Sequence, residues 1–580
     1  MRKINLTRLL RSLFTVLLVS LLAACTRQTA TLPAATSAPS ATAAMLPPTA
    51  APTVAPTRAP GAVNVAERDL PWWNDAVFYE VFVRSFADSD DDGIGDFNGL
   101  TQRLDYLNDG NPDTSSDLGI TGIWLMPIQP SPSYHGYDIT DYTAINPEYG
   151  TLEDFQAFLT AAHERGIRVI IDLVLNHTSS EHPWFVSAMQ GPGSPYYDYY
   201  VWSETDPGIR GPEGQTVWQT ASNGRYFYGY FWSGMPDLNY RNPAVTAEMD
   251  KVSAFWLEEV GIDGFRLDAV RHLVEDGSKL TNTPETHTWL QGFREEYKTL
   301  NPEAVTVGEI WDKSSAVAPY VQGNELDLAF NFDLASAWVT AAAGKDARTA
   351  SFVLNSDLQV FQPGQFATFL TNHDQNRVMN QVNGAVLRAK TAAALMLTAP
   401  GVPFVYYGEE IGMSGAKPDP QIRTPMQWNS AEGAGFTAGA PWEAINPDAE
   451  TVNVAAQDAE PASLLNHYRA LIHLRNANPA MRSADAWVLD AGTRSVYAVL
   501  RADHQQALLV LVNLDDEAVT DYALSLENGP LAGSFSVRGI YDSSAEDLPE
   551  LTANSTGGFA GYQPLPELAP GAVYVLELLP

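Results

Sequence analysis

Apolar and polar positions alternate in two distinct ways along the chain from residue 71 onward. Short apolar runs, typical of buried strands, are separated by longer stretches in which apolar residues recur at helical spacing. The helical spacing is clearest at 151–165, 244–260, 286–300 and 385–398. Strands that alternate with helices predict an α/β fold in which eight parallel strands close into a (β/α)8 TIM barrel. The predicted strands span residues 77–82, 120–126, 168–173, 264–267, 304–307, 326–330, 366–370 and 402–406.

Two stretches depart from this alternation. Residues 177–235, after the third predicted strand, are rich in Trp, Tyr, Gly and Pro without a helical period, which predicts a small inserted domain. After the last helical pattern, at 463–476, apolar residues alternate in short runs, which predicts a C-terminal antiparallel β-sandwich at 481–580. The barrel would then comprise residues 71–176 and 236–480.

The N-terminal residues have the features of an export signal. Residues 1–24 carry a basic start and an apolar run, and they lead into Leu22-Ala23-Ala24-Cys25, which resembles a bacterial lipoprotein lipobox. The resemblance implies cleavage before Cys25 and lipidation of its thiol, although an ordinary signal peptide with an incidental cysteine is the alternative. Residues 25–70 are dominated by Ala, Thr, Pro and Ser, a composition that predicts an extended tether. We therefore expect an extracytoplasmic body that is lipid-anchored to a bacterial membrane or cell surface.

The charge of the chain narrows the range of partners. Lys and Arg total 34 and Asp and Glu total 69, so the formal net charge is -35. There is no basic stretch outside the extreme N-terminus, which argues against nucleic acid and against anionic membrane surfaces as partners. The N-terminal lipid would be the only membrane contact. With one cysteine, no intrachain disulfide is possible.

Polar residues gather where the predicted strands end, and in a barrel these ends form the active site. Asp268 follows the strand at 264–267, and Arg266 points to the same side of that strand. An arginine beside an aspartate keeps it ionised, as a carboxylate nucleophile requires, although a structural ion pair has the same pattern. Glu309 follows the fifth strand. Glycoside hydrolysis needs such a carboxylate pair, one neutral and one ionised.

Four of these strand-end motifs resemble those of the α-amylase family of glycoside hydrolases, family thirteen. They span residues 172–177, 264–272, 307–310 and 369–374, and an accessory motif at 235–239 lies at the end of the inserted domain. The resemblance covers about residues 71–580. It implies that Asp268 is the nucleophile, Glu309 the general acid/base and Asp374 a ligand of the sugar hydroxyls. The other implied substrate-binding residues are Tyr137, which would stack under the sugar, His177, His373 and Arg377, which would hydrogen-bond it, Arg266, and Arg271 and His272, which would contact the next sugar.

A second motif, Asp88-Ser89-Asp90-Asp91-Asp92-Gly93-Ile94-Gly95-Asp96, follows the first strand. Acids at every second position with glycines in a tight turn suit a hard cation. The motif resembles the Ca²⁺ site in the first loop of the oligo-1,6-glucosidase and intermediate amylase subgroups, whose ligands here would be Asp88, Asp90, Asp92, Asp96 and the Ile94 carbonyl. A solvated acidic loop is the alternative. Many α-amylases have another calcium site at the Asn176 position, but the inserted-domain acids that would complete it are not identifiable from the sequence.

Three features bear on the substrate. The accessory motif at 235–239 is intermediate between the oligo-1,6-glucosidase and neopullulanase types. Tyr134 stands where exo-acting relatives place an aspartate, and Ala269 stands where α-1,6-specific relatives place Val. Both favour endo-acting cleavage of α-1,4 bonds in starch and maltodextrins. The alternatives are an α-glucosidase, a neopullulanase or cyclomaltodextrinase, or a transglycosylase of the same family, and a surface glucan-binding protein.

Overall fold

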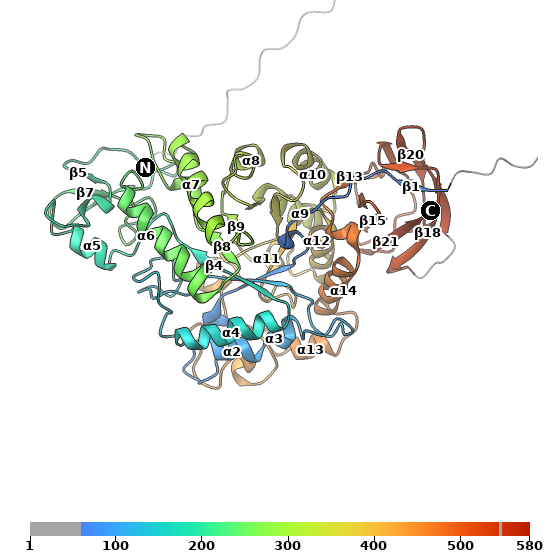
Figure 1. The fold of residues 1–580 in the computed structure, drawn as a ribbon. Helices are drawn as coiled ribbons and strands as arrows, with labels where there is room; N and C mark the ends of the chain where they lie inside the picture. The colour runs from blue at the N-terminus through green and yellow to red at the C-terminus, as the bar shows by residue number, and fades with distance from the viewer. Residues whose placement is uncertain (1–59, 544–547) are drawn as a thin grey trace, which may run out of the picture. The chain divides into compact units, whose positions relative to one another are not determined.

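The computed structural model describes residues 60–543 and 548–580, and its centre is a closed barrel of eight parallel strands in the order β10-β11-β12-β2-β3-β4-β8-β9 (Figure 1). The predicted TIM barrel is therefore confirmed. The sequence-based strand bounds agree with the observed ones to within about two residues. The barrel strands are β2 (Phe78–Val81), β3 (Gly122–Leu125), β4 (Arg168–Leu173), β8 (Gly264–Leu267), β9 (Val305–Gly308), β10 (Leu328–Phe330), β11 (Phe366–Thr368) and β12 (Val402–Tyr406).

Helices pack around this barrel, and their starts follow from local sequence. Helix α4 (Leu152–Glu164) begins with a capping box, in which the Thr151 hydroxyl accepts from the Asp154 N–H and the Asp154 carboxylate accepts from Thr151. Among the residues described, no helix is both long and apolar enough to cross a membrane. The other long helices are α6 (Pro243–Ala254), α7 (Pro284–Leu300), α8 (Ser314–Gln322), α9 (Phe332–Gly344), α10 (Arg348–Val360), α12 (Val386–Thr398) and α14 (Leu464–Ala477).

The helix predicted at 244–260 is not α-helical throughout. α6 passes into a π-helical turn, η3 (Phe255–Val260), which ends at Gly261 with φ of 90°. Glycine adopts this left-handed conformation without a Cβ clash. The chain then returns directly into β8, the strand that leads to Asp268.

The barrel interior is filled from alternate strand residues, as expected for side chains that point inward at every second position. Phe78 stacks on Phe404 with ring centroids 4.5 Å apart. Trp124, Phe330 and Val307 belong to the same buried cluster. The polar residues lie at the carboxyl ends of the strands, beyond this apolar plug.

The segment after β4 forms a small antiparallel sheet of β5 (Trp202–Ser203), β7 (Tyr226–Tyr228) and β6 (Trp218–Thr220), in that order. It also contains a helix, α5 (Pro183–Ala188), where the sequence shows no helical period. Six residues are too few for a period to be recognised. The His182 side chain caps this helix by accepting from the Trp184 N–H.

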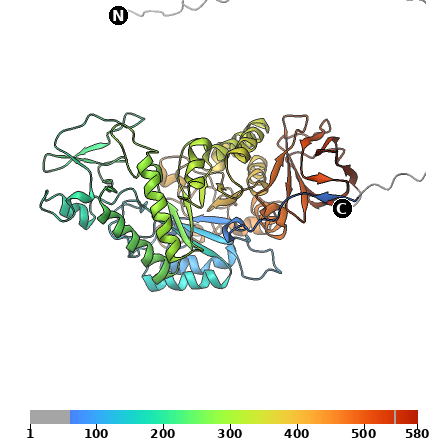
Figure 2. The ribbon, with the colours of Figure 1, turned by 45° about the horizontal axis from the view of Figure 1, so that its top comes forward.

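The C-terminal strands, orange to red in Figures 1 and 2, form antiparallel sheets separate from the barrel sheet. Buried leucines and valines from both sheets form one apolar cluster. Arg501 of β14 donates to the Thr398 carbonyl of α12, 2.5 Å away, and so joins this region to the barrel. The larger sheet has the order β13 (Ala486–Val488), β14 (Val496–Ala502), β15 (Ala507–Asn513), β21 (Val573–Leu579), β18 (Ser534–Tyr541) and β19 (Leu548–Thr552), and the smaller one pairs β16 (Leu524–Asn528) with β20 (Gly557–Tyr562).

The tether predicted for residues 25–70 extends too far. Strand β1 (Ala62–Val63) pairs antiparallel with β17 (Leu531–Ala532), and Arg68 makes a two-point ion pair with Asp485 at 2.9 and 3.0 Å. Val63 packs against the apolar cluster of the C-terminal sheets. The first described residues are therefore part of the folded body, because non-local pairing stabilises a segment whose composition alone predicts no structure. The predicted signal peptide, Cys25 and the tether up to residue 59 lie outside the described residues.

Candidate active site

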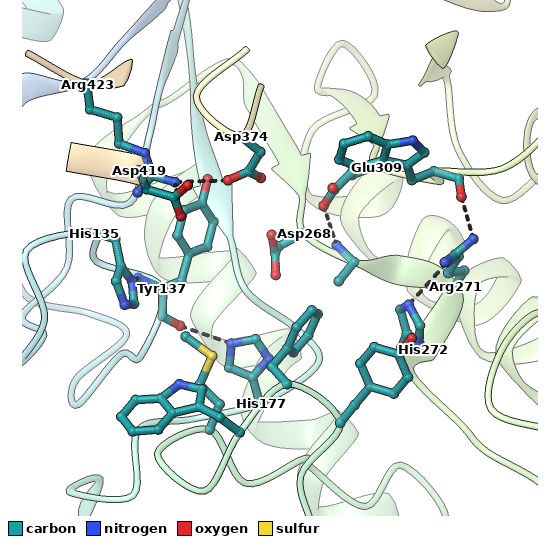
Figure 3. A pocket seen from close by; sticks show the side chains of 16 residues that line it. His135, Tyr137, His177, Asp268, Arg271, His272, Glu309, Asp374, Asp419 and Arg423 are labelled. Carbon is teal, nitrogen blue, oxygen red and sulfur yellow. Dashed lines mark hydrogen bonds and ion pairs between the residues drawn. The ribbon is translucent and has the colours of Figure 1, made fainter. Parts of the chain in front are cut away.

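A cleft of about 430 Å³ opens where the barrel strands end, and residues of the inserted segment form part of its wall (Figure 3). Asp268, Glu309 and Asp374 all line it. Figure 3 shows Asp268 between the other two carboxyl groups. Arg271 and His272 lie on the Glu309 side of the cleft, and Arg423 lies on the Asp374 side. The three carboxyl groups that the sequence singles out, together with Tyr137, His177, Arg271 and His272, thus line one cavity.

A buried guanidinium lies beneath the carboxylates. Arg266 donates from Nη1 to Asp268 Oδ1 at 2.8 Å and to both oxygens of Asp172 at 2.8 and 2.9 Å. It donates from Nη2 to Glu309 Oε2 at 2.7 Å. The pairing with Asp268 is the one expected from the strand pattern, whereas the pairing with Glu309 was not anticipated. Arg266 itself does not line the cleft, so any role in substrate binding is indirect.

Burial and charge act against each other at Asp268. Burial raises the pKa of Asp268 to about 6, although the Arg266 charge lowers it, and the charges of Asp172 and Asp374 raise it further. Asp268 is still mainly ionised at neutral pH. The pairing with Arg266 alone would suggest a pKa below the usual range, but burial outweighs the charge of Arg266. At Glu309, burial raises the pKa, Arg266 opposes this, and the negative charge of Asp268 adds to it.

One oxygen of Glu309 is fully engaged. Oε2 accepts from Arg266 and also from the Ala269 backbone N–H, which is 3.1 Å away. Ala269 has φ of 47° and ψ of 33°, the left-handed conformation that non-glycine residues rarely adopt. Such a backbone costs on the order of 1–3 kcal/mol and persists where the surroundings enforce it. The turn after Asp268 therefore aims a backbone donor at Glu309.

His373 lies one layer below the cleft. Its Nε2 is 2.7 Å from the Tyr137 hydroxyl and 3.3 Å from Asp374 Oδ2, and its Nδ1 pairs with Glu80. Burial lowers its pKa, but the carboxylates of Asp374 and Glu80 outweigh this and raise it to about 9. Tyr137 stacks on it with centroids 5.4 Å apart and also donates to Asp172. His373 does not line the cleft, so it supports Tyr137 and Asp374 from below.

The structure does not place Arg377 at the cleft, where the resemblance implies that it hydrogen-bonds the sugar. Arg377 is buried, donates to the carbonyls of Ile422 and Tyr407 at 3.0 and 2.7 Å, and does not line the cleft. Arg423, by contrast, lines the cleft, and it donates to Asp374 Oδ1 and to the His373 carbonyl, both at 2.9 Å. Arg423 lies in the loop after β12 and far from the end of that strand, so a pattern of polar residues at strand ends does not identify it.

Asp374 stays ionised. Burial raises its pKa, but the charges of His373, Arg423 and Arg266 hold it well below the usual range. It therefore presents a permanent negative charge to the cleft, in contrast to Asp268 and Glu309.

Two neutral histidines, His177 and His272, also line the cleft. Burial lowers the pKa of His177 and of His272 to about 3. The Tyr137 carbonyl lies 3.1 Å from His177 Nε2, and Arg271 donates to His272 Nε2 at 3.1 Å. Arg271 also donates to the Trp311 carbonyl. Both histidines and Arg271 line the cleft.

The acidic motif after β2 holds a cluster of carboxylates. Asp88, Asp90 and Asp96 each offer an oxygen, and these oxygens lie within 4.8 Å of one another. Two oxygens bound to one Ca²⁺ at about 2.4 Å are at most about 4.8 Å apart, so the cluster fits such an ion. Asp92 lies outside this group, and its Oδ1 accepts instead from the Ile94 N–H at 2.8 Å.

Asn176 Oδ1 and Asp237 Oδ2 are among the buried side-chain oxygens of the described residues that have no hydrogen-bond partner. They lie on paired segments, since the Leu238 N–H donates to the Asn176 carbonyl. Burial raises the pKa of Asp237 well above its usual value. Asp237 is thus an acid of the inserted segment that lies near Asn176, and buried oxygens without a partner fit a cation.

Comparison with known proteins agrees with this geometry. Residues 80–484 match the family model for the α-amylase catalytic domain. Alpha-amylase 3 of Dictyoglomus thermophilum is 41% identical over 450 residues, which cover 77% of this chain and 86% of that protein. The oligo-1,6-glucosidase of Parageobacillus thermoglucosidasius is 31% identical over 523 residues, 77% of this chain and 91% of that protein. The crystal structure of an α-amylase from H. orenii superposes with a TM-score of 0.76 and 41% identity, covering 87% of this chain and 99% of that one. A closed barrel, its cleft of carboxylates and these matches together place the chain in the α-amylase family of glycoside hydrolases, family thirteen.

Proposed function

We propose that this hydrolase is a retaining, endo-acting enzyme that cleaves α-1,4-glucosidic bonds of starch and maltodextrins. The observation that carries the proposal is that Asp268 and Glu309 both line the cleft and both accept hydrogen bonds from the buried Arg266. Such a pair of carboxyl groups suits attack by one and proton donation by the other. The similarity to two α-amylases supports the choice of substrate.

In the first step Asp268 attacks the anomeric carbon and forms an ester bond, while the bond to the glycosidic oxygen breaks. Glu309 gives that oxygen its proton. Because Glu309 Oε2 already accepts two N–H groups, the proton sits on Oε1. In the second step the ionised Glu309 takes a proton from water, and the water oxygen displaces Asp268, which restores the α configuration.

The remaining cleft residues position the sugar. Asp374 accepts hydroxyl groups of the glucose at the cleavage site, and its contacts strengthen as the ring flattens. His177 and Arg423 hydrogen-bond the same sugar, and it stacks on Tyr137. Because Glu309 protonates the leaving oxygen, the leaving sugar lies on the side of Arg271 and His272 (Figure 3).

The decisive measurement is the product profile. The enzyme should release a mixture of maltooligosaccharides from amylose, and proton NMR should show the α-anomer first. An initial β-anomer would mean inversion and would remove Asp268 as nucleophile. Glucose as the sole product would favour an α-glucosidase, the alternative suggested by the oligo-1,6-glucosidase match. Turnover of maltotriose into longer chains would favour a transglycosylase, and pullulan cleavage a neopullulanase.

The proposal extends to Ca²⁺. Asp88, Asp90 and Asp96 would hold one ion. Asp92 and the Ile94 carbonyl would be its further ligands. Asn176 and Asp237 would contribute to a second. Ca²⁺ would act structurally, by neutralising clustered carboxylates and binding the folded state.

The proposed location is extracytoplasmic, with a lipid on Cys25 as the membrane anchor. The N-terminal signal pattern supports this assignment. A neutral, polymeric substrate outside the cell is consistent with the acidic body, because binding it needs no charge attraction.

A further inference from the structure

Three side chains that do not line the cleft join the segment after β8 to the loop after β9: Asn282, Asp312 and Tyr320. Asn282 lies at the centre of this network, just before helix α7. Its backbone N–H donates to the Arg271 carbonyl at 2.9 Å, and its Nδ2 donates to Asp312 Oδ2 at 3.2 Å. The Tyr320 hydroxyl, from α8, donates to Asn282 Oδ1 at 2.7 Å. One asparagine therefore contacts both segments and helix α8.

These hydrogen bonds fix the orientation of the Asn282 amide. Its nitrogen faces the Asp312 carboxylate, which accepts hydrogen bonds, and its oxygen accepts from the Tyr320 hydroxyl. Tyr320 is fully buried, and its ring packs on His287 with centroids 4.4 Å apart. The hydroxyl that orients the amide is thus itself held in place, and the Asn282 side chain presents its N–H to Asp312.

The backbone of Asn282 also calls for this residue type. Its φ is 54°, in the left-handed region, which asparagine adopts more readily than most other non-glycine residues. Such residues cluster at functional sites, where the surroundings enforce them. Ala269, directly after Asp268, has the same conformation, so the segment from residue 269 to residue 282 begins and ends with a left-handed residue. Asparagine at 282 combines this backbone with a side chain that both donates and accepts.

Asp312 links Asn282 to the cleft. Its Oδ2 accepts from Asn282 and, at 3.4 Å, from Arg271 Nη1, which also donates to the Trp311 carbonyl. Arg271 lines the cleft, and Trp311 and Asp312 follow Glu309 by two and three residues. A shift of Asp312 would therefore change the position of Arg271 and of the turn that follows Glu309.

We propose that Asn282 is a positioning residue for the transfer of the proton from Glu309 to the leaving sugar. It acts through Asp312, which holds Arg271 and the turn after Glu309. The inference rests on the proposed function, in which Glu309 protonates the leaving oxygen and the leaving sugar lies beside Arg271. Misplacement of a proton donor lowers the rate only where the leaving group needs a proton. The contribution of Asn282 should therefore depend on the leaving group of the substrate.

The test compares the full chain carrying Asn282→Gly with the wild type on maltoheptaose and on an activated aryl maltoside, whose leaving group needs no proton. Glycine removes the amide but still permits the left-handed backbone. Asn383→Gly is the matched control, because Asn383 also has a positive φ, of 57°, is exposed, and does not line the cleft. Thermal melts establish that each variant is folded.

In Asn282→Gly, kcat/KM for maltoheptaose should fall about tenfold to a hundredfold, the range expected for small misplacements at an active site. The value for the aryl maltoside should change little, and the Asn383→Gly control should match the wild type on both substrates. Equal losses on both substrates, or no loss on maltoheptaose, would overturn the positioning role and leave the proposed function intact. A wild type that cleaves no maltoheptaose would instead refute the proposed function.

A second variant keeps the side chain and changes only its donor. Asn282→Asp still accepts from Tyr320, but it places a second carboxylate against Asp312 in place of the N–H. Like charges at this distance repel, so Asp312 should be displaced and the same loss on maltoheptaose should appear, with the aryl maltoside again little affected. Wild-type kcat/KM for maltoheptaose in a folded Asn282→Asp protein would show that the bond to Asp312 is not needed and would overturn the proposal.

Discussion

Arg266 donates to Asp268 and to Glu309, so one buried guanidinium influences both carboxyl groups that the chemistry uses. Burial raises the pKa of each, and Arg266 opposes that rise. Asp374, by contrast, is held ionised by His373 and Arg423. At the scale of single residues, the cleft therefore contains one permanent anion and two carboxyl groups whose protonation is linked.

Removing either member of the carboxyl pair should reduce turnover without unfolding the protein. Asp268→Asn and Glu309→Gln should each lower kcat on maltoheptaose by at least about 10²–10⁴-fold. An activated aryl maltoside needs no proton on its leaving group, so Glu309→Gln should still form the glycosyl-enzyme from it. Mass spectrometry of trapped protein measures this intermediate. Its appearance in Asp268→Asn would contradict the assignment.

The pH dependence follows from the same pair. Asp268 must be ionised to attack, and its pKa is raised to about 6. Its ionised fraction falls as the pH falls through this value, so kcat/KM should drop about tenfold for each pH unit below it. At higher pH activity falls again, because Glu309 ionises and can no longer donate a proton. The plot of kcat/KM against pH should be bell-shaped, and its two apparent pKa values describe the coupled pair rather than either residue alone. Circular dichroism at each pH checks that the protein stays folded. Full activity about two pH units below the pKa of Asp268 would refute the expectation.

Single elements decide how these residues are presented. Strand β8 delivers Arg266 and Asp268, and the left-handed turn at Ala269 aims its N–H at Glu309. The loop between β2 and α2 (Phe97–Gln102) gathers Asp88, Asp90 and Asp96, and Asp96 also caps α2 by accepting from the Gly99 N–H. An ion in this loop would therefore stabilise the start of a helix as well as the loop.

Neighbouring acids of the loop offer a matched pair of variants. Asp90 is in the carboxylate cluster and Asp92 is not. If Ca²⁺ binds the folded state, it stabilises the protein by about 2.7 kcal/mol at a hundredfold excess over Kd. Asp90→Asn should abolish most of the rise in Tm on adding Ca²⁺, whereas Asp92→Asn should have a smaller effect. Thermal melts in Ca²⁺ and in EDTA measure this, and an unchanged wild-type Tm in EDTA would leave only a solvated acidic loop.

At the scale of the whole molecule, the chain start is fastened to the C-terminal sheets. β1 pairs with β17, and Arg68 pairs with Asp485. The first described residues are thus held on the C-terminal sheets before the chain enters the first barrel strand.

Cell fractionation tests the proposed anchor. The wild type should be found in the membrane fraction with lipid on Cys25, because the lipobox resemblance implies modification of that thiol. The Cys25→Ser variant should carry no lipid and should leave the membrane fraction, and the activity of the purified protein should be unchanged. Wild-type protein that is wholly soluble and carries an unmodified N-terminal region would reject the anchor.

The sequence by itself determined the barrel strands and the positions of Asp268, Glu309 and Asp374 at their ends. This was possible because side-chain alternation is a local property, and strand ends in a parallel barrel converge on one face. Only the tertiary structure decided that Arg423 and not Arg377 reaches Asp374, that Arg266 binds Glu309, and that Asp237 lies beside Asn176. It also decided that residues 60–68 belong to the folded body, and that Asn282 donates to Asp312. Each of these depends on contacts between residues far apart in the chain, and no local period encodes which distant partner a side chain meets.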